Sequence, residues 1–184
     1  MNSDYTTKLL AGTVFPDITA TLLSGEPVNL AKPKAGFDWK LVLVYRGKHC
    51  PLCTRYLNQL ELFKGALTDI GVDIVAVSGD SKTQLEAHSE QLEVSYDISY
   101  GLSVEQMKTL GLYISDPRSE QETDHPFAEP GLFVINAEGH IQVVDISNNP
   151  FVRPELQALV NGLAWIRNPD NNYPIRGMHN TNPQ

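Results

Sequence analysis

The stretch Trp39-Lys40-Leu41-Val42-Leu43-Val44-Tyr45-Arg46-Gly47-Lys48-His49-Cys50-Pro51-Leu52-Cys53 decides the fold of this chain. Its first seven residues are mostly apolar, which is typical of a strand that is buried on both faces. After Gly47 the apolar residues recur with a helical period, from about Cys50 to Thr68. The stretch therefore predicts a buried strand, a short turn and a helix that begins near Cys50.

Cys50 and Cys53 are the two cysteines of the chain, in the spacing C-x-x-C. A helix N-terminus offers unpaired N–H groups and the positive end of the helix dipole, so the pKa of Cys50 should lie below the ordinary value of about 8.5. Arg46, Lys48 and a protonated His49 would add positive charge beside it. Cys53 follows one turn later, within reach as a second thiol. The pattern predicts a redox-active dithiol.

The cysteine pair has two other interpretations, a structural role and a role in binding zinc. Buried cysteines can serve as small apolar residues, and C-x-x-C is also half of a zinc site, which needs two further ligands. The remaining histidines occur singly and are expected on the surface; they are His88, His125, His140 and His179. We therefore expect no metal, and no cofactor, because the two sulfurs carry the electrons themselves.

The other elements follow from apolar periodicity and turn residues. Together they predict an α/β domain over residues 1–167, with a central mixed sheet flanked by helices and an N-terminal hairpin, followed by a polar C-terminal tail over residues 168–184. In chain order we expect a hairpin over 18–30, a strand at 72–77, a helix at 81–91, a short strand at 94–98, a short helix at 103–110, an irregular segment at 114–130, a hairpin over 132–144 and a helix from Pro154 to Trp165.

Composition limits the classes of function. The chain has 184 residues, 41% of them hydrophobic, and a formal net charge of −8. This charge disfavours nucleic-acid binding, which needs a basic face. No stretch approaches the roughly 20 apolar residues that span a bilayer, and Met1 to Tyr5 do not resemble a signal peptide. We expect a cytoplasmic protein without membrane contact, in a compartment where thiols are kept reduced.

Three segments carry a family resemblance: Phe15-Pro16-Asp17 with the hairpin after it, the strand running into Cys50, and Pro130-Gly131-Leu132-Phe133-Val134-Ile135. They resemble the peroxiredoxin-like (redoxin) branch of the thioredoxin-like superfamily, from about Val14 to Leu163. The resemblance implies a thioredoxin-like fold, with Cys50 as the attacking cysteine and Cys53 as the resolving one. It also implies that Glu129–Pro130 is a cis bond facing the dithiol.

The chain departs from the peroxiredoxin pattern at two places. Peroxiredoxins usually carry Pro-x-x-x-Thr-x-x-Cys, and here Leu43 and Gly47 stand at the Pro and Thr positions. Pro130 stands where the family commonly has an arginine. Arg118 and Arg153 would replace that arginine only if loops bring them to the dithiol.

Three functions stay open. The first is a peroxiredoxin-like antioxidant enzyme that reduces a hydroperoxide, with Arg46, His49 and Pro130 supporting the two cysteines. The second is a thioredoxin-like oxidoreductase acting on a protein disulfide. The third is a non-catalytic binding domain on a redoxin fold. For the enzymes the resemblance implies an external dithiol reductant, such as a thioredoxin or glutathione system, and a homodimer as the oligomer to test.

Overall fold

The structure is a computed structural model that describes residues 7–179; Met1 to Tyr5, and the last five residues of the expected tail, lie outside the described residues. Seven strands form one mixed sheet in the order β2-β1-β5-β4-β3-β8-β9. β3 is parallel to β4 and antiparallel to β8. The strands are β1 (Thr19–Leu22), β2 (Pro27–Asn29), β3 (Trp39–Val44), β4 (Val72–Val77), β5 (Asp97–Tyr100), β8 (Gly131–Ile135) and β9 (Ile141–Ile146).

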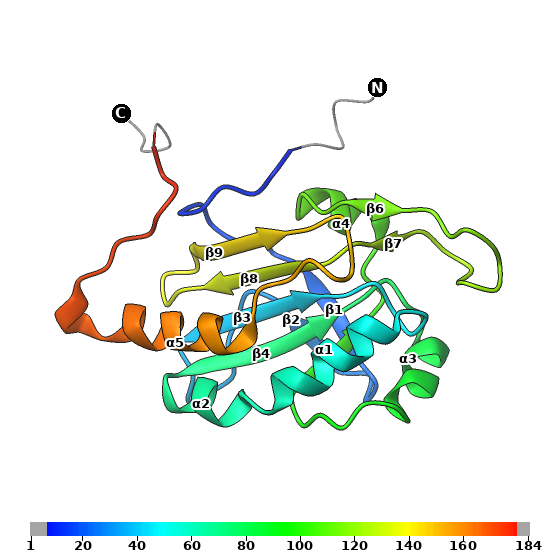
Figure 1. Cartoon of the computed structure of the whole chain (residues 1–184), viewed down its shortest axis with the longest axis horizontal. Helices are drawn as coiled ribbons and strands as arrows, with labels where there is room; N and C mark the ends of the chain where they lie inside the picture. Colours follow the sequence, from blue (N-terminus) through cyan, green and yellow to red (C-terminus); the bar gives the residue numbers. More distant parts are fainter. Residues whose placement is uncertain (1–6, 180–184) are drawn as a thin grey trace.

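Helices cover the sheet, as Figure 1 shows. α1, α2 and α5 contribute to a single apolar cluster on one face of the sheet, whereas α4 packs against the other face together with the N-terminal segment. The helices are α1 (Pro51–Glu61), α2 (Lys64–Asp69), α3 (Lys82–Ser89), α4 (Val104–Thr109) and α5 (Leu156–Arg167). None of the described helices is long and apolar enough to cross a membrane.

The central strand β3 is buried along its whole length. Successive side chains of a strand point to opposite faces, so Leu41 and Leu43 join the cluster under α1 and α5, while Val42 and Val44 join the cluster of the opposite face. The predicted buried strand, the N-terminal hairpin of β1 with β2, and the central mixed sheet flanked by helices are all confirmed.

The helix expected from Cys50 to Thr68 is wrong in its length. α1 ends at Glu61, and α2 begins only at Lys64. At the junction the N–H of Leu62 bonds the carbonyl of Gln59 at 3.1 Å, which is a tighter turn than the α-helical one. The break leaves Leu62 exposed and Phe63 packed against the core.

The strand expected at 94–98 begins three residues later, because side chains of α1 accept hydrogen bonds from the backbone N–H groups that precede it. The N–H of Glu93 donates to Asn58 Oδ1 at 2.8 Å, and the N–H of Ser95 donates to Glu61 Oε2 at 2.9 Å. These donors are therefore not available to a sheet, and β5 starts at Asp97 opposite Val75.

The closing helix does not begin at Pro154. Its N-cap is Glu155, whose carboxylate accepts from the N–H groups of Gln157 and Ala158 at 3.1 and 2.6 Å. The carbonyl of Pro154 instead accepts the hydroxyl of Tyr56 at 2.6 Å. An acidic side chain at the N-cap accepts hydrogen bonds from the unpaired N–H groups of the first turn, which proline cannot do.

The predicted cis bond is also wrong. Every peptide bond in the described residues is trans, Glu129–Pro130 included. The segment expected to be irregular holds the short strands β6 (Ile114–Ser115) and β7 (Phe127–Ala128), which pair with each other. The chain runs on from β7 through Pro130 into β8 in an extended path, and the Pro130 carbonyl accepts from the N–H of Ser147 at 3.0 Å. A trans bond suits such a path.

Candidate active site

The dithiol lies where β3 leads into α1, as the sequence predicts. Cys50 is the N-cap of α1, and its Sγ accepts a hydrogen bond from the N–H of Cys53 at 3.2 Å. Pro51 occupies the first turn, where its missing N–H costs nothing. The two sulfurs form a disulfide, and both cysteines are almost fully buried.

Gly47 and Asp80 shape the turn before Cys50. Gly47 has a φ of +140°, and a Cβ at this position would lie 2.5 Å from Asp80 Oδ1. The threonine of the peroxiredoxin pattern does not fit here, because the buried Asp80 carboxylate takes its space. Asp80 Oδ2 also accepts from the N–H of Lys48 at 2.7 Å. This carboxylate therefore holds the turn from which the dithiol helix starts.

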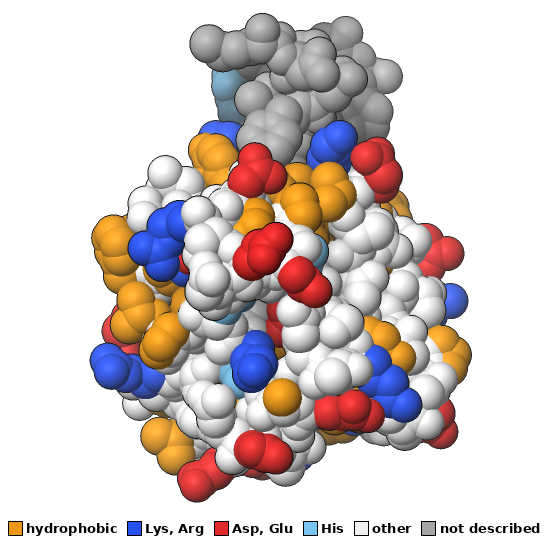
Figure 2. Space-filling view, turned by 90° about the vertical axis from the view of Figure 1, so that its right-hand side faces the viewer, with side chains coloured by type: hydrophobic (Ala, Val, Ile, Leu, Met, Phe, Trp, Pro, Cys, Tyr) orange, Lys and Arg blue, Asp and Glu red, His pale blue; other side chains and the backbone are white. Residues whose placement is uncertain are grey.

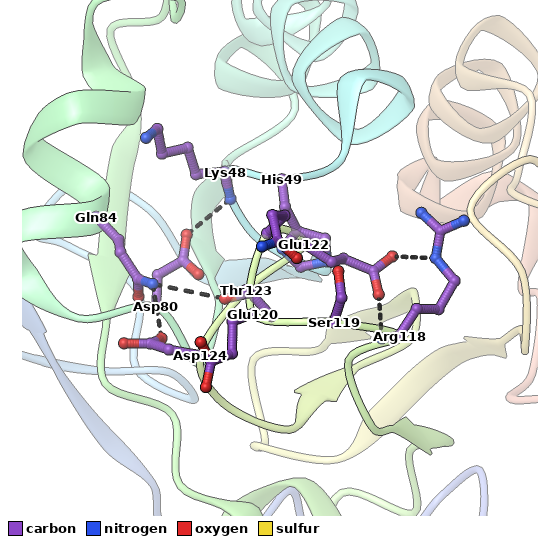
Figure 3. A pocket seen from close by; sticks show the side chains of 11 residues that line it. Lys48, His49, Asp80, Gln84, Arg118, Ser119, Glu120, Glu122, Thr123 and Asp124 are labelled. Carbon is purple, nitrogen blue, oxygen red and sulfur yellow. Dashed lines mark hydrogen bonds and ion pairs between the residues drawn. The ribbon is translucent and has the colours of Figure 1, made fainter.

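Asp80 also binds the segment between β6 and β7. His125 Nε2 lies 3.2 Å from Asp80 Oδ1 and 3.1 Å from Gln84 Oε1. The segment lines an open pocket of about 640 Å³ beside the turn, shown in Figure 3. Burial raises the pKa of Asp80. The lining is polar and comes from Lys48, His49, Asp80, Gln84 and residues 118–124.

Arg118 does not reach the dithiol. Its side chain is 86% exposed and pairs with Glu122 at 3.1 Å, as the dashed lines in Figure 3 show. Figure 2 looks onto this end of the molecule, where acidic and basic side chains are interspersed and no continuous basic patch is visible. Of the two candidate arginines, this one is a surface residue.

Arg153 does reach the dithiol. Its Nη2 lies 2.8 Å from Cys53 Sγ, although a hundred residues separate the two in sequence. The guanidinium carbon stacks over the Tyr56 ring at 4.9 Å, and the Tyr56 hydroxyl bonds Pro154, the next residue along the chain. Burial lowers the pKa of Arg153 to about 10. The side chain is therefore still charged at neutral pH.

Arg46 and His49 lie close to the dithiol without adding free positive charge. Arg46 Nε pairs with the buried Glu129 Oε2 at 3.1 Å, and its guanidinium stacks on Phe127 at 4.7 Å. His49 packs edge-on against the same ring at 4.5 Å. Burial, and then the charge of Arg46, lower the pKa of His49 to about 4. The protonated His49 considered from the sequence is thus absent at neutral pH.

His88 is buried, which corrects its expected place on the surface. Its Nε2 lies 2.8 Å from the hydroxyl of Thr54, the residue after Cys53. Burial lowers the pKa of His88 to about 4. The ring is also tilted against Tyr45, with 5.9 Å between centroids. This histidine supports α1 from α3 as a neutral ring.

Pro130 is buried, and its hydrogen bond to Ser147 fixes the start of the loop that carries Arg153. Among residues 7–179, no group of three or more His, Cys, Asp or Glu side chains is placed to hold a metal ion.

In the sequence analysis, no role at the dithiol was given to three contributors, which are Asp80, Tyr56 and Glu129. A signal for Asp80 was present. It follows the buried strand β4, which lies parallel and adjacent to β3, so polar residues after the two strands meet at one sheet edge. Tyr56 and Glu129 had no such signal, since their partners Arg153 and Arg46 are distant in sequence.

Comparisons with known proteins agree with this geometry. Alkyl hydroperoxide reductase C of Bacillus subtilis (strain 168) is 23% identical over 139 residues, which cover 76% of this chain and 72% of the relative. The crystal structure of a peroxiredoxin-like protein from Aquifex aeolicus superposes with a TM-score of 0.71 at 15% identity, covering 87% of this chain and 89% of that one. Mycobacterium tuberculosis AhpC gives a TM-score of 0.70 at 14% identity, covering 89% and 96%.

These structural likenesses establish the thioredoxin-like fold of peroxiredoxins. The AhpC/TSA family matches residues 11–144, well over half of the chain. That span includes β3, the dithiol and β8, the segments on which the resemblance was based. The chain belongs to the AhpC/TSA family, as a peroxiredoxin-like thiol oxidoreductase of the thioredoxin-like superfamily.

Proposed function

We propose that this chain reduces hydroperoxides, with Cys50 as the attacking thiolate and Cys53 as the resolving thiol. The observation that carries the proposal is the position of Cys50 at the N-cap of α1, in disulfide contact with Cys53. A thiolate at a helix N-terminus faces unpaired N–H groups and the positive end of the helix dipole. Here the Cys53 N–H already points at the Cys50 sulfur.

The reaction has three balanced steps. The Cys50 thiolate attacks the terminal peroxide oxygen; the O–O bond breaks, the alkoxide takes a proton and leaves as an alcohol, and Cys50 becomes a sulfenic acid. Cys53 then attacks the Cys50 sulfur, the S–O bond breaks, and the hydroxide takes a proton and leaves as water. An external dithiol reduces the resulting disulfide by two exchange steps.

The surroundings of the dithiol have supporting roles in this proposal. Gly47 and Asp80 set the turn, Arg46 neutralises the buried Glu129, His49 packs beside the turn, and Pro130 anchors the loop that leads to Arg153.

The proposal extends to the cellular setting. The substrate is a hydroperoxide, as the name of the Bacillus relative says of that protein, and the reductant is a dithiol of the thioredoxin or glutathione type. We place the protein in the cytoplasm, as a homodimer, with residues 1–167 as the redoxin domain and residues 168–184 as a polar tail. A net charge of −8 argues against nucleic-acid partners.

The second candidate is a protein thiol-disulfide oxidoreductase that uses the same cysteines. The intact Cys50-Pro51-Leu52-Cys53 unit, closed as a disulfide in the first turn of α1, favours it. Pro130, the other feature that favours it, stands directly before β8, with the Glu129–Pro130 bond in the trans form.

Trapping the oxidised cysteine tests the first candidate. Reduced Cys53→Ser protein, given one equivalent of hydrogen peroxide and then dimedone, should carry the dimedone adduct on Cys50 alone, as located by peptide mass spectrometry. The unaltered chain should instead form the Cys50–Cys53 disulfide, and Cys50→Ser should show neither product. An absent adduct, with disulfide substrates still reduced, would support the second candidate. Inertness toward both would leave a binding role.

A further inference from the structure

Arg153 is partly buried and contacts the dithiol, and no carboxylate in residues 7–179 forms an ion pair with it. Arg46 pairs with Glu129 and Arg118 pairs with Glu122. Arg153 donates from Nη2 to Cys53 Sγ at 2.8 Å, while its Nε and Nη1 are buried without a hydrogen-bond partner. A guanidinium taken partly out of water without a counter-ion is costly. The sulfur of Cys53 stands where the counter-ion should be.

In the disulfide form the positive charge of Arg153 has no counter-ion. A bonded sulfur is a weak acceptor and carries no net charge, so it compensates the guanidinium poorly. Reduction would place a thiolate at the same point, and a charge-assisted contact would replace the weak one. The site around Cys53 is therefore better matched to the reduced protein than to the oxidised protein described here.

We propose that Arg153 is a catalytic residue that keeps Cys53 as a thiolate in the reduced enzyme. The inference rests on the proposed roles of the two cysteines. It attributes the stabilisation of the Cys53 thiolate to its contact with Arg153. The helix N-terminus serves Cys50, whereas an arginine from the loop before α5 serves Cys53.

Two steps of the cycle use this thiolate. In the condensation, the Cys53 thiolate attacks Cys50 sulfenic acid directly, so no base has to remove a proton from Cys53 first. In the reduction, a reductant thiolate attacks Cys50 Sγ, the S–S bond breaks, and Cys53 leaves as a thiolate paired with Arg153. A lower pKa of the leaving thiol speeds its departure, so the reductant should be directed to Cys50.

The other charged and titratable groups around Arg153 do not replace it. Tyr56, below the guanidinium, is neutral because burial raises its pKa. Arg46 and Glu129 act on Arg153 only through space and in opposite directions, and the two are already paired with each other. Asp145 and Glu155 act on Tyr56 from β9 and from the N-cap of α5, and both are negative. They would oppose a thiolate, so Arg153 is the group that favours one.

A single-thiol titration tests the inference without any measurement of turnover. In Cys50→Ser protein the thiolate absorbance at 240 nm reports Cys53 alone. Burial by itself would raise the pKa of this thiol, and an opposite charge in contact lowers a pKa by about 1 to 3 pH units. We expect a midpoint below about pH 7, which rises by at least about 1 pH unit when Arg153→Met is added. Arg153→Lys should fall between them.

Arg55→Met is the matched control. Arg55 lies on the exposed side of α1, two residues after Cys53, so its loss removes the same charge without touching the sulfur and should leave the midpoint unchanged. A midpoint at or above about 8.5 with Arg153 intact would overturn the inference, whether or not Arg153→Met folds. So would equal midpoints in the folded Arg153→Met and Arg55→Met proteins.

A redox equilibrium gives an independent reading. Because Arg153 favours the reduced form, Arg153→Met should shift the equilibrium with glutathione toward the disulfide, by up to about tenfold for each pH unit by which the Cys53 pKa rises, at a pH above both midpoints. An unchanged equilibrium constant would contradict the inference. The reaction of Cys50 with hydroperoxide is measured in a separate experiment. A failure of the proposed peroxidase function can therefore be distinguished from a failure of the role assigned to Arg153.

Discussion

The two cysteines lie three residues apart, yet their surroundings are built differently. On the Cys50 side both buried carboxylates have partners: Glu129 has Arg46, and Asp80 has the Lys48 N–H and His125. On the Cys53 side Arg153 has only the sulfur. The difference indicates that the first region fixes the shape of the turn and the second supplies charge to the dithiol. Changes in the two regions should therefore affect different measurements.

The largest expected effect on the Cys50 side comes from Arg46→Met. It would leave Glu129, which is buried, without its cation and should cost about 3 to 5 kcal/mol of unfolding free energy in urea. The double variant Arg46→Met, Glu129→Gln should recover much of this loss. The Cys53 thiolate midpoint should not move. A shift as large as that of Arg153→Met would remove the distinction between the two regions.

The neutral histidine beside α1 gives a pH-dependent effect of similar size. The folded-state pKa of His88 is lowered to about 4 by burial, so its stabilising contribution is complete above the unfolded value of about 6.5 and is lost as the pH falls toward 4. At about 1.36 kcal/mol per pH unit, this is about 3 kcal/mol.

His88→Gln should remove this acid sensitivity from urea unfolding curves recorded between pH 7 and pH 4. Thr54→Val is the matched control, because it deletes the hydrogen bond to His88 but keeps the histidine. It should keep the wild-type dependence on pH. An identical slope in His88→Gln and wild type would contradict the assignment.

A smaller effect should come from the turn itself. Gly47→Ala combines a positive φ with a Cβ only 2.5 Å from Asp80 Oδ1, and it should cost about 2 kcal/mol. Gly36→Ala is the control, because Gly36 has a φ of +93° but nothing within 4 Å of an added Cβ. It should cost about 1 kcal/mol. Equal costs in thermal unfolding would mean that Asp80 does not shape the turn.

The smallest effect should come from Arg118→Met. An ion pair whose cation is exposed, as Arg118 is in its pair with Glu122, contributes less than about 1 kcal/mol. The change should leave the Cys53 midpoint as it is, since Arg118 does not touch the dithiol. A midpoint that rises as it does in Arg153→Met would show that both arginines act on the pair.

The sequence was sufficient for the parts of the fold that depend on local pattern. β3 and β4 are mostly apolar runs, with one charged residue each, Lys40 and Asp73. Ser81 and Ser103 cap α3 and α4. The dithiol was predictable for the same reason, because a buried strand and a helical period meet at Cys50. Prediction from the sequence was less reliable where tertiary contacts compete with the local apolar pattern. Glu93 and Ser95 are examples, because side chains of α1 accept hydrogen bonds from their N–H groups.

The charge distribution of the site was not predictable from local pattern. Arg153 and Arg118 look alike as single arginines in polar segments, and only the path of the chain after Pro130 and Ser147 brings one of them to Cys53. The neutral state of His49 depends on its burial and on Arg46. Such effects depend on desolvation and on contacts between distant segments, which periodicity does not encode.

The most direct test of the central claim is the rate at which the reduced chain consumes hydrogen peroxide, measured as peroxide loss with a dithiol reductant in excess. The account predicts sustained turnover, a fall to background in Cys50→Ser, and a single turnover without recycling through the intramolecular disulfide in Cys53→Ser. Peroxide consumption that is equally slow in wild type and Cys50→Ser would contradict the assignment of Cys50 as the peroxide-reducing cysteine.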